Sequence, residues 1–564
     1  MKEIKIMGKK ISKRLCINTL VVIIFILFIA FVLSIAPNYI RNEIKDKTNL
    51  IINNNNVTSK LKKDVIIDEN GNVYISKEDA TNYFDKYLEY DKETKDIITT
   101  SDTKVAKLKI DDKNIKVNGT ETKMAVAPIE KNGTIYLPFS EMEKVYNIDL
   151  NYIKDTDRVI IDSLDRELST VNSRKNLKIK YKDKKLSSTV DKVKKGDELV
   201  WISKGDNDWV KVRTKNGKIG YVKEKDTANQ IYVRQKMEEK NKVNGKINLV
   251  WDYYSEYVKA PNREGTTIEG VNVVSPSFFS LEKEGKGNIV ENIGDEGRAY
   301  IEWAKSNEYQ IWAMVSNNSL KETTTEIMKN EELRENLIDN IVREAVKYEV
   351  DGINIDFENM YSEDKDLFSR FIIELAPRLK DCGITLSVDV TAPDGSETWS
   401  LCFDRNVIGD VADYIVFMAY DQYGISSKNP GTTAGCNWVE TNINKFLNQE
   451  DVKKEKIILG IPLYTRMWKE TDGKITSSVV NMNKIEENLP AESVVERKWD
   501  DELKQYYVEY KMNNTVYRMW IEDEKSITEK LNLIKKYELA GAAFWEKDRE
   551  TENIWKITKN ILNE

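Results

Sequence analysis

The stretch Asp351-Gly352-Ile353-Asn354-Ile355-Asp356-Phe357-Glu358 decides the fold of this chain. Its β-forming residues alternate with three polar ones, Asn354, Asp356 and Glu358. Successive side chains of a strand point to opposite faces, so these three polar side chains share one face. Burying carboxyl groups on a strand costs free energy unless the groups are used. The stretch therefore predicts a buried strand that also carries a functional site.

The two carboxyls of this strand, Asp356 and Glu358, stand two residues apart. This spacing separates their backbone positions by about 6–7 Å. Carboxyls at such a distance influence each other's ionisation, which general acid catalysis near neutral pH requires. We therefore take the pair as candidate catalytic residues.

Seven further apolar runs flank this strand, and helical patterns such as 331–348 and 364–380 lie between most of them. The eight predicted strands are 247–251, 271–274, 310–315, 352–357, 384–390, 414–420, 457–461 and 540–545. This rhythm predicts an α/β fold, a (β/α)8 barrel over residues 245–564. The long segment 466–539 predicts a small α+β insertion between strands seven and eight, with a strand pair at 506–510 and 516–520.

Composition restricts the chemistry of the 564-residue chain. Histidine is absent, which excludes Ser-His-Asp and Cys-His nucleophilic sites and histidine-ligated metals. The four cysteines form no Cys-x-x-Cys pair, so no disulfide framework is implied. We expect no metal and no cofactor, and proton transfer must depend on Asp, Glu, Tyr or Lys.

The N-terminal residues carry a membrane signal. Residues 17–36 are almost wholly apolar and long enough to span a bilayer, and six basic residues precede them. The positive-inside rule predicts a cytoplasmic tail at 1–16, a transmembrane helix at 17–36 and an extracytoplasmic remainder. A cleaved signal peptide is the alternative. The polar, Asn-rich residues 37–63 predict a linker.

Two small domains are predicted before the barrel. Residues 64–168 combine an Asn70-Gly71 hairpin signal with the run Gly133-Thr-Ile-Tyr-Leu-Pro138, a helix and a closing strand. This pattern resembles the copper amine oxidase N-terminal-like domain, a small α+β module. The segment contains no His or Cys, so the resemblance implies no copper chemistry.

Residues 169–228 contain Trp209-Val-Lys-Val-Arg213 followed by Asn216-Gly-Lys-Ile-Gly-Tyr-Val222. This pattern resembles the bacterial Src-homology-3-type (SH3-like) domain and implies a small β-barrel, while 229–244 predicts a linker. Residues 174–225 carry 17 Lys and Arg against 7 Asp and Glu. Such a basic surface fits anionic wall polymers as a partner, or is simply solvated. We expect no nucleic acid partner.

In a (β/α)8 barrel, functional side chains lie at the carboxyl ends of the strands. Residues at these ends besides Asp356 and Glu358 are Met418, Tyr420, Asp421, Tyr464, Arg466 and Trp545. The sequence therefore predicts carboxyls, tyrosines and aromatic rings at one site, a combination suited to sugars.

The Asp351–Glu358 stretch resembles the Asp-x-x-Asp-x-Asp-x-Glu signature of glycoside hydrolase family 18. Met418-Ala-Tyr420-Asp421, Leu459-Gly-Ile-Pro-Leu-Tyr464 and Trp545 extend the resemblance over 245–564. It implies that Glu358 is the general acid and that Asp356 holds the 2-acetamido group of the substrate, whose oxygen is the nucleophile. Tyr420 would form a hydrogen bond with that acetamido group, Asp421 would contact the sugar, and Trp545 would form the floor of the sugar-binding pocket.

One position departs from the signature, because Asn354 stands where its third Asp is usual. An Asn cannot take a proton, but this form resembles the branch of the family that acts on bacterial peptidoglycan, including spore cortex. Asp351 lies off the shared face and is expected to be structural. The sequence favours an envelope-anchored N-acetylglucosaminidase of peptidoglycan; a chitinase-like enzyme acting on chitin oligomers and a non-catalytic sugar-binding protein are the alternatives.

Overall fold

The computed structural model describes residues 21–30, 46–235, 243–255, 257–490 and 497–563. The chain forms two compact units. The first extends to residue 238 without 102–105, and the second takes in 102–105 and everything from residue 239 onward.

The N-terminal part of the first unit is rich in β-structure around one apolar core. One sheet has the order β12 (Ile148–Ile153), β13 (Arg158–Ser163), β1 (Asn49–Ile52), β2 (Asn55–Asn56). A second sheet consists of β10 (Ile129–Lys131), β11 (Thr134–Pro138), β4 (Val73–Ser76) and β3 (Ile66–Ile67). A third consists of β5 (Glu89–Tyr90), β6 (Asp96–Thr100), β7 (Val105–Lys109), β8 (Asn114–Val117) and β9 (Thr120–Lys123). The only α-helices described in this part are the short α2 (Lys77–Tyr83) and α3 (Glu143–Tyr146), so it is more β-rich than the predicted α+β domain.

The predicted linker at 37–63 is wrong over 49–60. Strand β1 pairs in parallel with β13, and its Leu50 and Ile51 are buried in the core. The asparagines that suggested a tether belong to a tight turn, since Asn53 and Asn54 adopt positive φ. The apolar triplet inside the Asn-rich segment is thus a central strand, and residues 37–45 lie outside the described part.

Residues 168–234 form one seven-stranded antiparallel sheet. Its order is β16 (Thr189–Val193), β15 (Leu177–Lys180), β19 (Ile219–Lys223), β18 (Trp209–Arg213), β17 (Glu198–Lys204), β14 (Leu168–Asn172), β20 (Ile231–Arg234). The predicted linker at 229–244 is therefore wrong at its start, because β20 pairs with β14 as an edge strand. Residues 236–242 lie outside the described part.

The second unit contains the predicted barrel. Its eight strands are β21 (Ile247–Asp252), β22 (Val273–Pro276), β25 (Gln310–Ser316), β26 (Gly352–Asp356), β27 (Thr385–Val390), β28 (Tyr414–Met418), β29 (Ile457–Pro462) and β35 (Gly541–Trp545). Each strand pairs in parallel with the next, and β35 closes the ring by pairing with β21. All eight predicted strands are confirmed, and no strand end differs from its predicted position by more than two residues.

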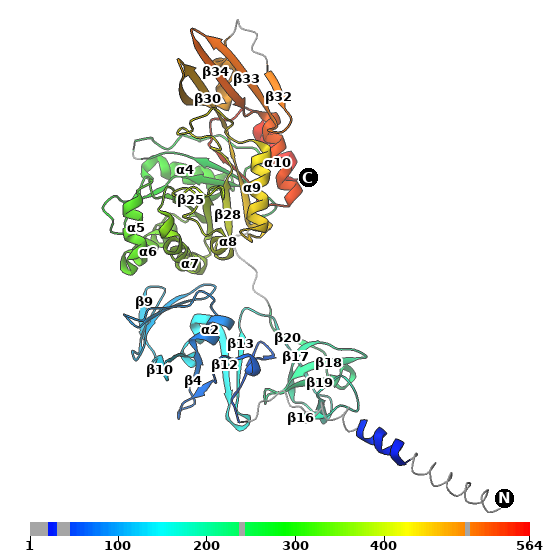
Figure 1. Cartoon of the computed structure of the whole chain (residues 1–564). Helices are drawn as coiled ribbons and strands as arrows, with labels where there is room; N and C mark the ends of the chain where they lie inside the picture. Colours follow the sequence, from blue (N-terminus) through cyan, green and yellow to red (C-terminus); the bar gives the residue numbers. More distant parts are fainter. Residues whose placement is uncertain (1–20, 31–45, 236–242, 256, 491–496, 564) are drawn as a thin grey trace, which may run out of the picture. The chain divides into compact units, whose positions relative to one another are not determined.

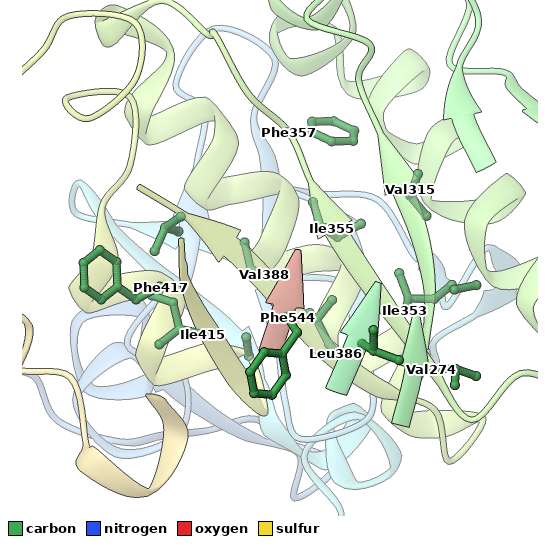
Figure 2. Close-up of a cluster of buried hydrophobic side chains, with 14 of the residues drawn as sticks. Val274, Val315, Ile353, Ile355, Phe357, Leu386, Val388, Ile415, Phe417 and Phe544 are labelled. Carbon is green, nitrogen blue, oxygen red and sulfur yellow. The ribbon is translucent and has the colours of Figure 1, made fainter. Parts of the chain in front are cut away.

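Alternating side chains fill two cores. Those pointing outward from the strands, including Ile353, Ile355 and Phe357, pack under the surrounding helices (Figure 2). Those pointing inward, such as Trp251 and Trp312, fill the barrel. The helices are α4 (Gly294–Ser306), α5 (Lys321–Lys329), α6 (Glu331–Lys347), α7 (Lys365–Asp381), α8 (Arg405–Val411), α9 (Cys436–Asn448), α10 (Glu524–Tyr537) and α11 (Ile554–Asn563) (Figure 1).

Two additions decorate the barrel. A hairpin of β23 (Phe279–Leu281) and β24 (Ile289–Glu291) follows β22. The insertion between strands seven and eight is a five-stranded antiparallel sheet, which Figure 1 shows at one end of the barrel. Its order is β31 (Lys474–Asn481), β30 (Tyr464–Thr471), β34 (Thr515–Ile521), β33 (Gln505–Met512), β32 (Arg497–Asp500). The predicted strand pair is confirmed as β33 and β34.

The predicted transmembrane segment at 17–36 lies outside the described residues except for 21–30, which are helical. Among the residues that the structure describes, no helix combines the length and the apolar character needed to cross a membrane.

Barrel closure depends on a backbone approach at Gly541. A Cβ added at Gly541 would lie 2.0 Å from the carbonyl oxygen of Ile247 on the neighbouring strand. We predict that Gly541→Ala lowers the free energy of unfolding by about 3 kcal/mol, because the added methyl group forces the closing strands apart. Urea unfolding of the two proteins measures this loss.

Gly424→Ala is the matched control. A Cβ there would meet nothing nearer than 3.8 Å, so this variant should unfold like the wild type. Equal stability of the Gly541→Ala variant and the wild type would contradict the argument.

Candidate functional site

The polar face of β26 points into the barrel, as predicted. Asn354 is fully buried, whereas Asp356 and Glu358 are half-buried. Glu358 lies beyond the end of β26, and Asn317, which follows β25, holds its backbone from both sides. Asn317 Nδ2 donates to the Glu358 carbonyl (2.9 Å), and the Glu358 amide donates to Asn317 Oδ1 (3.0 Å). A buried amide thus fixes where the acid stands, a role that the sequence did not indicate.

Asn354 connects four barrel strands through its amide. Its Oδ1 accepts from Trp251 Nε1 (2.8 Å) and Ser275 Oγ (3.3 Å). Its Nδ2 donates to Ser387 Oγ (3.0 Å) and Asp389 Oδ1 (2.7 Å). Because the indole nitrogen can only donate, the orientation of this amide is determined.

Asp389 is a third carboxyl of the site, and the sequence analysis missed it. It lies on β27, and its side chain is almost fully buried. A signal was available, since Thr385, Ser387 and Asp389 alternate with apolar residues as the polar residues of β26 do. Two neighbouring strands therefore present matching polar ladders to the barrel interior.

Burial shifts the ionisation of all three carboxyls. Desolvation, followed by the nearby charges of Asp356 and Asp421, raises the pKa of Glu358 from 4.5 to about 8. Desolvation and then the charge of Asp389 raise the pKa of Asp356 well above its ordinary value, and desolvation likewise raises the pKa of Asp389. Glu358 with such a pKa is largely protonated at neutral pH, which gives the site an acid.

A second group comes from the sixth strand and the insertion. Tyr464 Oη donates to Asp421 Oδ1 (2.8 Å), and Arg466 Nη2 donates to the same oxygen (3.2 Å). Asp421 is exposed and has a positive φ, which turns the chain sharply after β28. The ring of Tyr420 lies 6.4 Å from that of Tyr464, and desolvation raises the pKa of Tyr420 well above its ordinary value.

Aromatic rings complete the site. Trp545, half-buried at the end of β35, lies 5.8 Å from the ring of Trp251 and 6.3 Å from that of Tyr253. Tyr253 is exposed and was not predicted, although it follows Trp251 with the same two-residue spacing. Met418 is buried at the end of β28. Eight of the nine predicted site residues thus lie at the carboxyl ends of the strands or in the chain just beyond them, whereas Asn354 lies within β26, buried inside the barrel.

Other sequence predictions are also resolved. Asp351 is structural as expected, since its Oδ2 accepts from the amide of Ile311. In the part of the chain that the structure describes, no group of three or more Cys, Asp or Glu residues is arranged to hold a metal ion.

The barrel carries two carboxyls close together, one of them protonated, and aromatic rings at the same end. This arrangement is typical of glycosidases. The family model for glycosyl hydrolases family 18 matches residues 218–550. The chain belongs to this family. The model for the copper amine oxidase N-terminal domain matches residues 51–161, which agrees with the predicted resemblance and with the start of the domain at β1.

Curated relatives match about half of the chain. It is 29% identical over 300 residues to the uncharacterized glycosylase YvbX of Bacillus subtilis, covering 51% of this chain and 84% of that one. It is 27% identical to the putative sporulation-specific glycosylase YdhD of the same organism, covering 48% and 65%. It is 24% identical to the cortical fragment-lytic enzyme of Bacillus anthracis, covering 50% and 66%.

Two solved structures align with more than half of the chain. The chain aligns with a chitinase from Chromobacterium violaceum at 21% identity and a TM-score of 0.49, covering 57% of this chain and 99% of that one. It aligns with the spore cortex-lytic enzyme SleL of Bacillus megaterium at 22% identity and a TM-score of 0.49, covering 59% and 76%.

The raised pKa of Glu358 predicts a pH-dependent stability. The folded state keeps a proton on Glu358 up to about pH 8, whereas the unfolded chain loses it near pH 4.5. Stability from this group is complete below pH 4.5 and is lost as the pH rises toward 8. We predict that Glu358→Gln, which cannot ionise, is more stable than the wild type by about 3 kcal/mol at pH 9 and by little at pH 4.

Thermal unfolding of the two proteins across this pH range tests the prediction. Glu363→Gln changes an exposed glutamate five residues on and should follow the wild type at every pH. Parallel curves for Glu358→Gln and the wild type would show that Glu358 ionises normally.

Proposed function

We propose that this chain hydrolyses β-1,4 bonds next to N-acetylglucosamine in peptidoglycan. The observation that carries the proposal is Glu358, a carboxyl of raised pKa that lies just beyond the end of β26, two residues after Asp356, in a family 18 barrel. A carboxyl with a pKa near 8 can protonate a leaving oxygen at neutral pH, where most other carboxyl side chains are ionised.

The proposed reaction retains configuration and uses the substrate's own nucleophile. Glu358 protonates the glycosidic oxygen while the 2-acetamido oxygen of the sugar attacks its anomeric carbon. Asp356 and Tyr420 hold the acetamido group, and Asp356 stabilises the charged cyclic intermediate. Glu358, now ionised, takes a proton from the water that opens this intermediate. The chain therefore needs an N-acetylated sugar and no nucleophile of its own.

The remaining site residues bind sugar in this proposal. Asp421, oriented by Tyr464 and Arg466, contacts sugar hydroxyls, and Trp545 stacks beneath the sugar ring. Met418, at the end of β28, packs against the same sugar ring. Asn354 supports the carboxyls from below rather than touching the substrate, since it is fully buried.

Two observations favour peptidoglycan as the polymer. The Asn354 form of the signature resembles the peptidoglycan branch, and relatives carry the names sporulation-specific glycosylase and cortical fragment-lytic enzyme. Chitin oligomers are the second candidate, favoured by weaker similarity to the secreted chitinase LysM12 of Penicillium expansum. A sugar-binding protein without hydrolysis is the third, and the presence of Glu358 disfavours it.

The N-terminal modules fit the same role. We propose that residues 17–36 anchor the protein in the cell membrane with its barrel on the outer side. Exposed basic residues of the seven-stranded sheet, among them Lys175, Lys184, Lys192 and Lys195, would meet anionic wall polymers. The SH3-like identity of this sheet remains a prediction.

Digestion of purified peptidoglycan tests the proposed reaction. The chain from residue 46 onward should release fragments whose reduced ends are N-acetylglucosaminitol, as identified by mass spectrometry. Glu358→Gln should lower the rate by at least about 1,000-fold, because it removes the acid. Reduced muramic ends would refute the proposed linkage.

The same assay separates the alternatives. Digestion of chitin oligomers with intact peptidoglycan would favour the chitinase reading. If wild type and Glu358→Gln release equally little from either polymer while retaining it in a pull-down, the binding protein is the better description.

Cell fractionation tests the anchor. The full-length protein, expressed in a Gram-positive host, should sediment with membranes and be accessible to external protease. The chain from residue 46 fused to a cleavable signal should instead appear in the medium, because it lacks the apolar segment. A full-length product whose N-terminus begins near residue 37 would refute the anchor and establish a cleaved signal.

A further inference from the structure

Asp389 is a buried carboxyl for which the proposed reaction has no use so far. It comes from β27, one strand away from the catalytic pair, and its side chain is only 1% exposed. Burying a carboxyl at this depth costs several kcal/mol unless the group is neutral or bonded. Its presence on the strand next to the reacting carboxyls therefore calls for a reason.

The strand register puts Asp389 beside Asp356. Strands β26 and β27 pair in parallel, with Asn354 opposite Ser387 and Ile355 opposite Val388. One residue further, Asp356 stands next to Asp389, and adjacent strands are about 4.8 Å apart. Both side chains point into the barrel, as the hydrogen bond between Asn354 and Ser387 shows one step below.

Hydrogen bonding leaves one oxygen of each carboxyl available. Asn354 Nδ2 occupies Asp389 Oδ1, and the orientation of this amide is determined by Trp251. A proton on Asp389 therefore belongs on its Oδ2. Within the described ranges, the buried Oδ1 of Asp356 has no hydrogen-bond partner.

We propose that Asp389 is the proton partner of Asp356: the two carboxyls share one proton, and Asp389 holds it when Asp356 must be ionised. The inference rests on the proposed function. As positive charge develops on the acetamido group, the O–H bond on Asp356 breaks and an O–H bond forms on Asp389 Oδ2. Asp356 becomes the carboxylate that faces the charge, and no proton leaves the barrel. Asp389 touches no substrate and is a positioning residue.

Electrostatics agree with a shared proton. The titratable groups that face the pair are Glu358, just beyond β26, and Tyr420, after β28. Besides desolvation, negative charge on the pair raises the pKa of both groups. The charge of Asp389 is the second cause that raises the pKa of Asp356. Two carboxyls that share a site ionise in two widely separated steps, and between these steps the pair keeps one proton.

Replacing Asp389 by Asn tests this role, because the variant keeps the shape and removes the proton site. In the wild type the acid limb of the kcat profile reports the first ionisation of the pair, which occurs at lower pH than that of Asp356 alone because the remaining proton is shared. In Asp389→Asn it reports Asp356 alone, so it should move to higher pH by about one unit. At a pH below the acid limb of the variant, we expect its kcat to be at least tenfold lower than that of the wild type, with KM within threefold. Both are measured from the new reducing ends released from solubilised peptidoglycan strands.

Exchanging the two partners provides the sharper test. The double variant Asn354→Asp/Asp389→Asn keeps the hydrogen bond between the two positions but moves the carboxyl to position 354, still beside Asp356. It should recover the wild-type acid limb and most of the lost kcat. Ser387→Ala removes a non-ionisable partner of Asn354 and should leave the acid limb at its wild-type pH.

The outcomes separate the two hypotheses. If the wild type hydrolyses neither peptidoglycan nor chitin oligomers, the proposed function fails and the role of Asp389 fails with it. If the wild type is active and Asp389→Asn keeps its acid limb and kcat, or the exchange restores nothing, the role of Asp389 alone is overturned. If Asp389→Asn does not fold, by its thermal unfolding, the exchanged variant alone decides: wild-type pH dependence supports the role, and inactivity in a folded protein refutes it.

Discussion

The buried amide of Asn354 is the interaction on which the site depends. Its four hydrogen bonds reach β21, β22 and β27 from β26, so one side chain sets the relative heights of four strands inside the barrel. Each bond is individually modest, but losing one would leave a donor or acceptor unpaired in a dry interior. The positions of Trp251, Asp389 and the strand that carries Asp356 and Glu358 are therefore coupled to a single group.

This amide also bears on how deeply each carboxyl is buried. Asn354 and Asp389 are fully buried, while Asp356 and Glu358 are half-buried. Charge is most costly at the most buried positions, and there the chain places a neutral amide beside a carboxyl of raised pKa. Towards solvent the pattern reverses, because Asp421 is exposed and paired with Arg466. Ionisation is thus graded from the barrel interior to its end.

The sequence predicted the barrel well because a strand buried on both faces leaves a strong signal. The alternation in 352–358 fixed the face of every side chain of β26, and the fold followed from repeating this argument over eight apolar runs. Prediction failed where a short strand was surrounded by turn residues. Leu50, Ile51 and Ile52 are too few to stand out among asparagines, and their role depends on pairing with β13 more than 100 residues away.

The candidate site was predicted only as far as single strands could be interpreted. Asp356, Glu358 and Asp421 follow from their places at strand ends, whereas Asn317 and Asp389 act across strands. Asn317 reaches the backbone of a residue 41 positions later, and Asp389 meets an amide 35 positions earlier. Neither contact leaves a pattern in the neighbouring sequence, because both depend on the register between strands.

The pairing of β26 with β27 also accounts for Asn at position 354. A carboxylate there would face Asp389 at hydrogen-bond distance, with Asp356 next to Asp389, and three acids would compete for protons in one dry region of the barrel. An amide removes one charge and supplies the donor that Asp389 Oδ1 accepts. The residue that looks like a loss when β26 is considered alone is therefore the complement of a carboxyl on β27. The functional unit of this site is therefore the pair of strands β26 and β27. The number of acids that this pair can carry is limited, because the buried ones must be kept neutral inside the barrel.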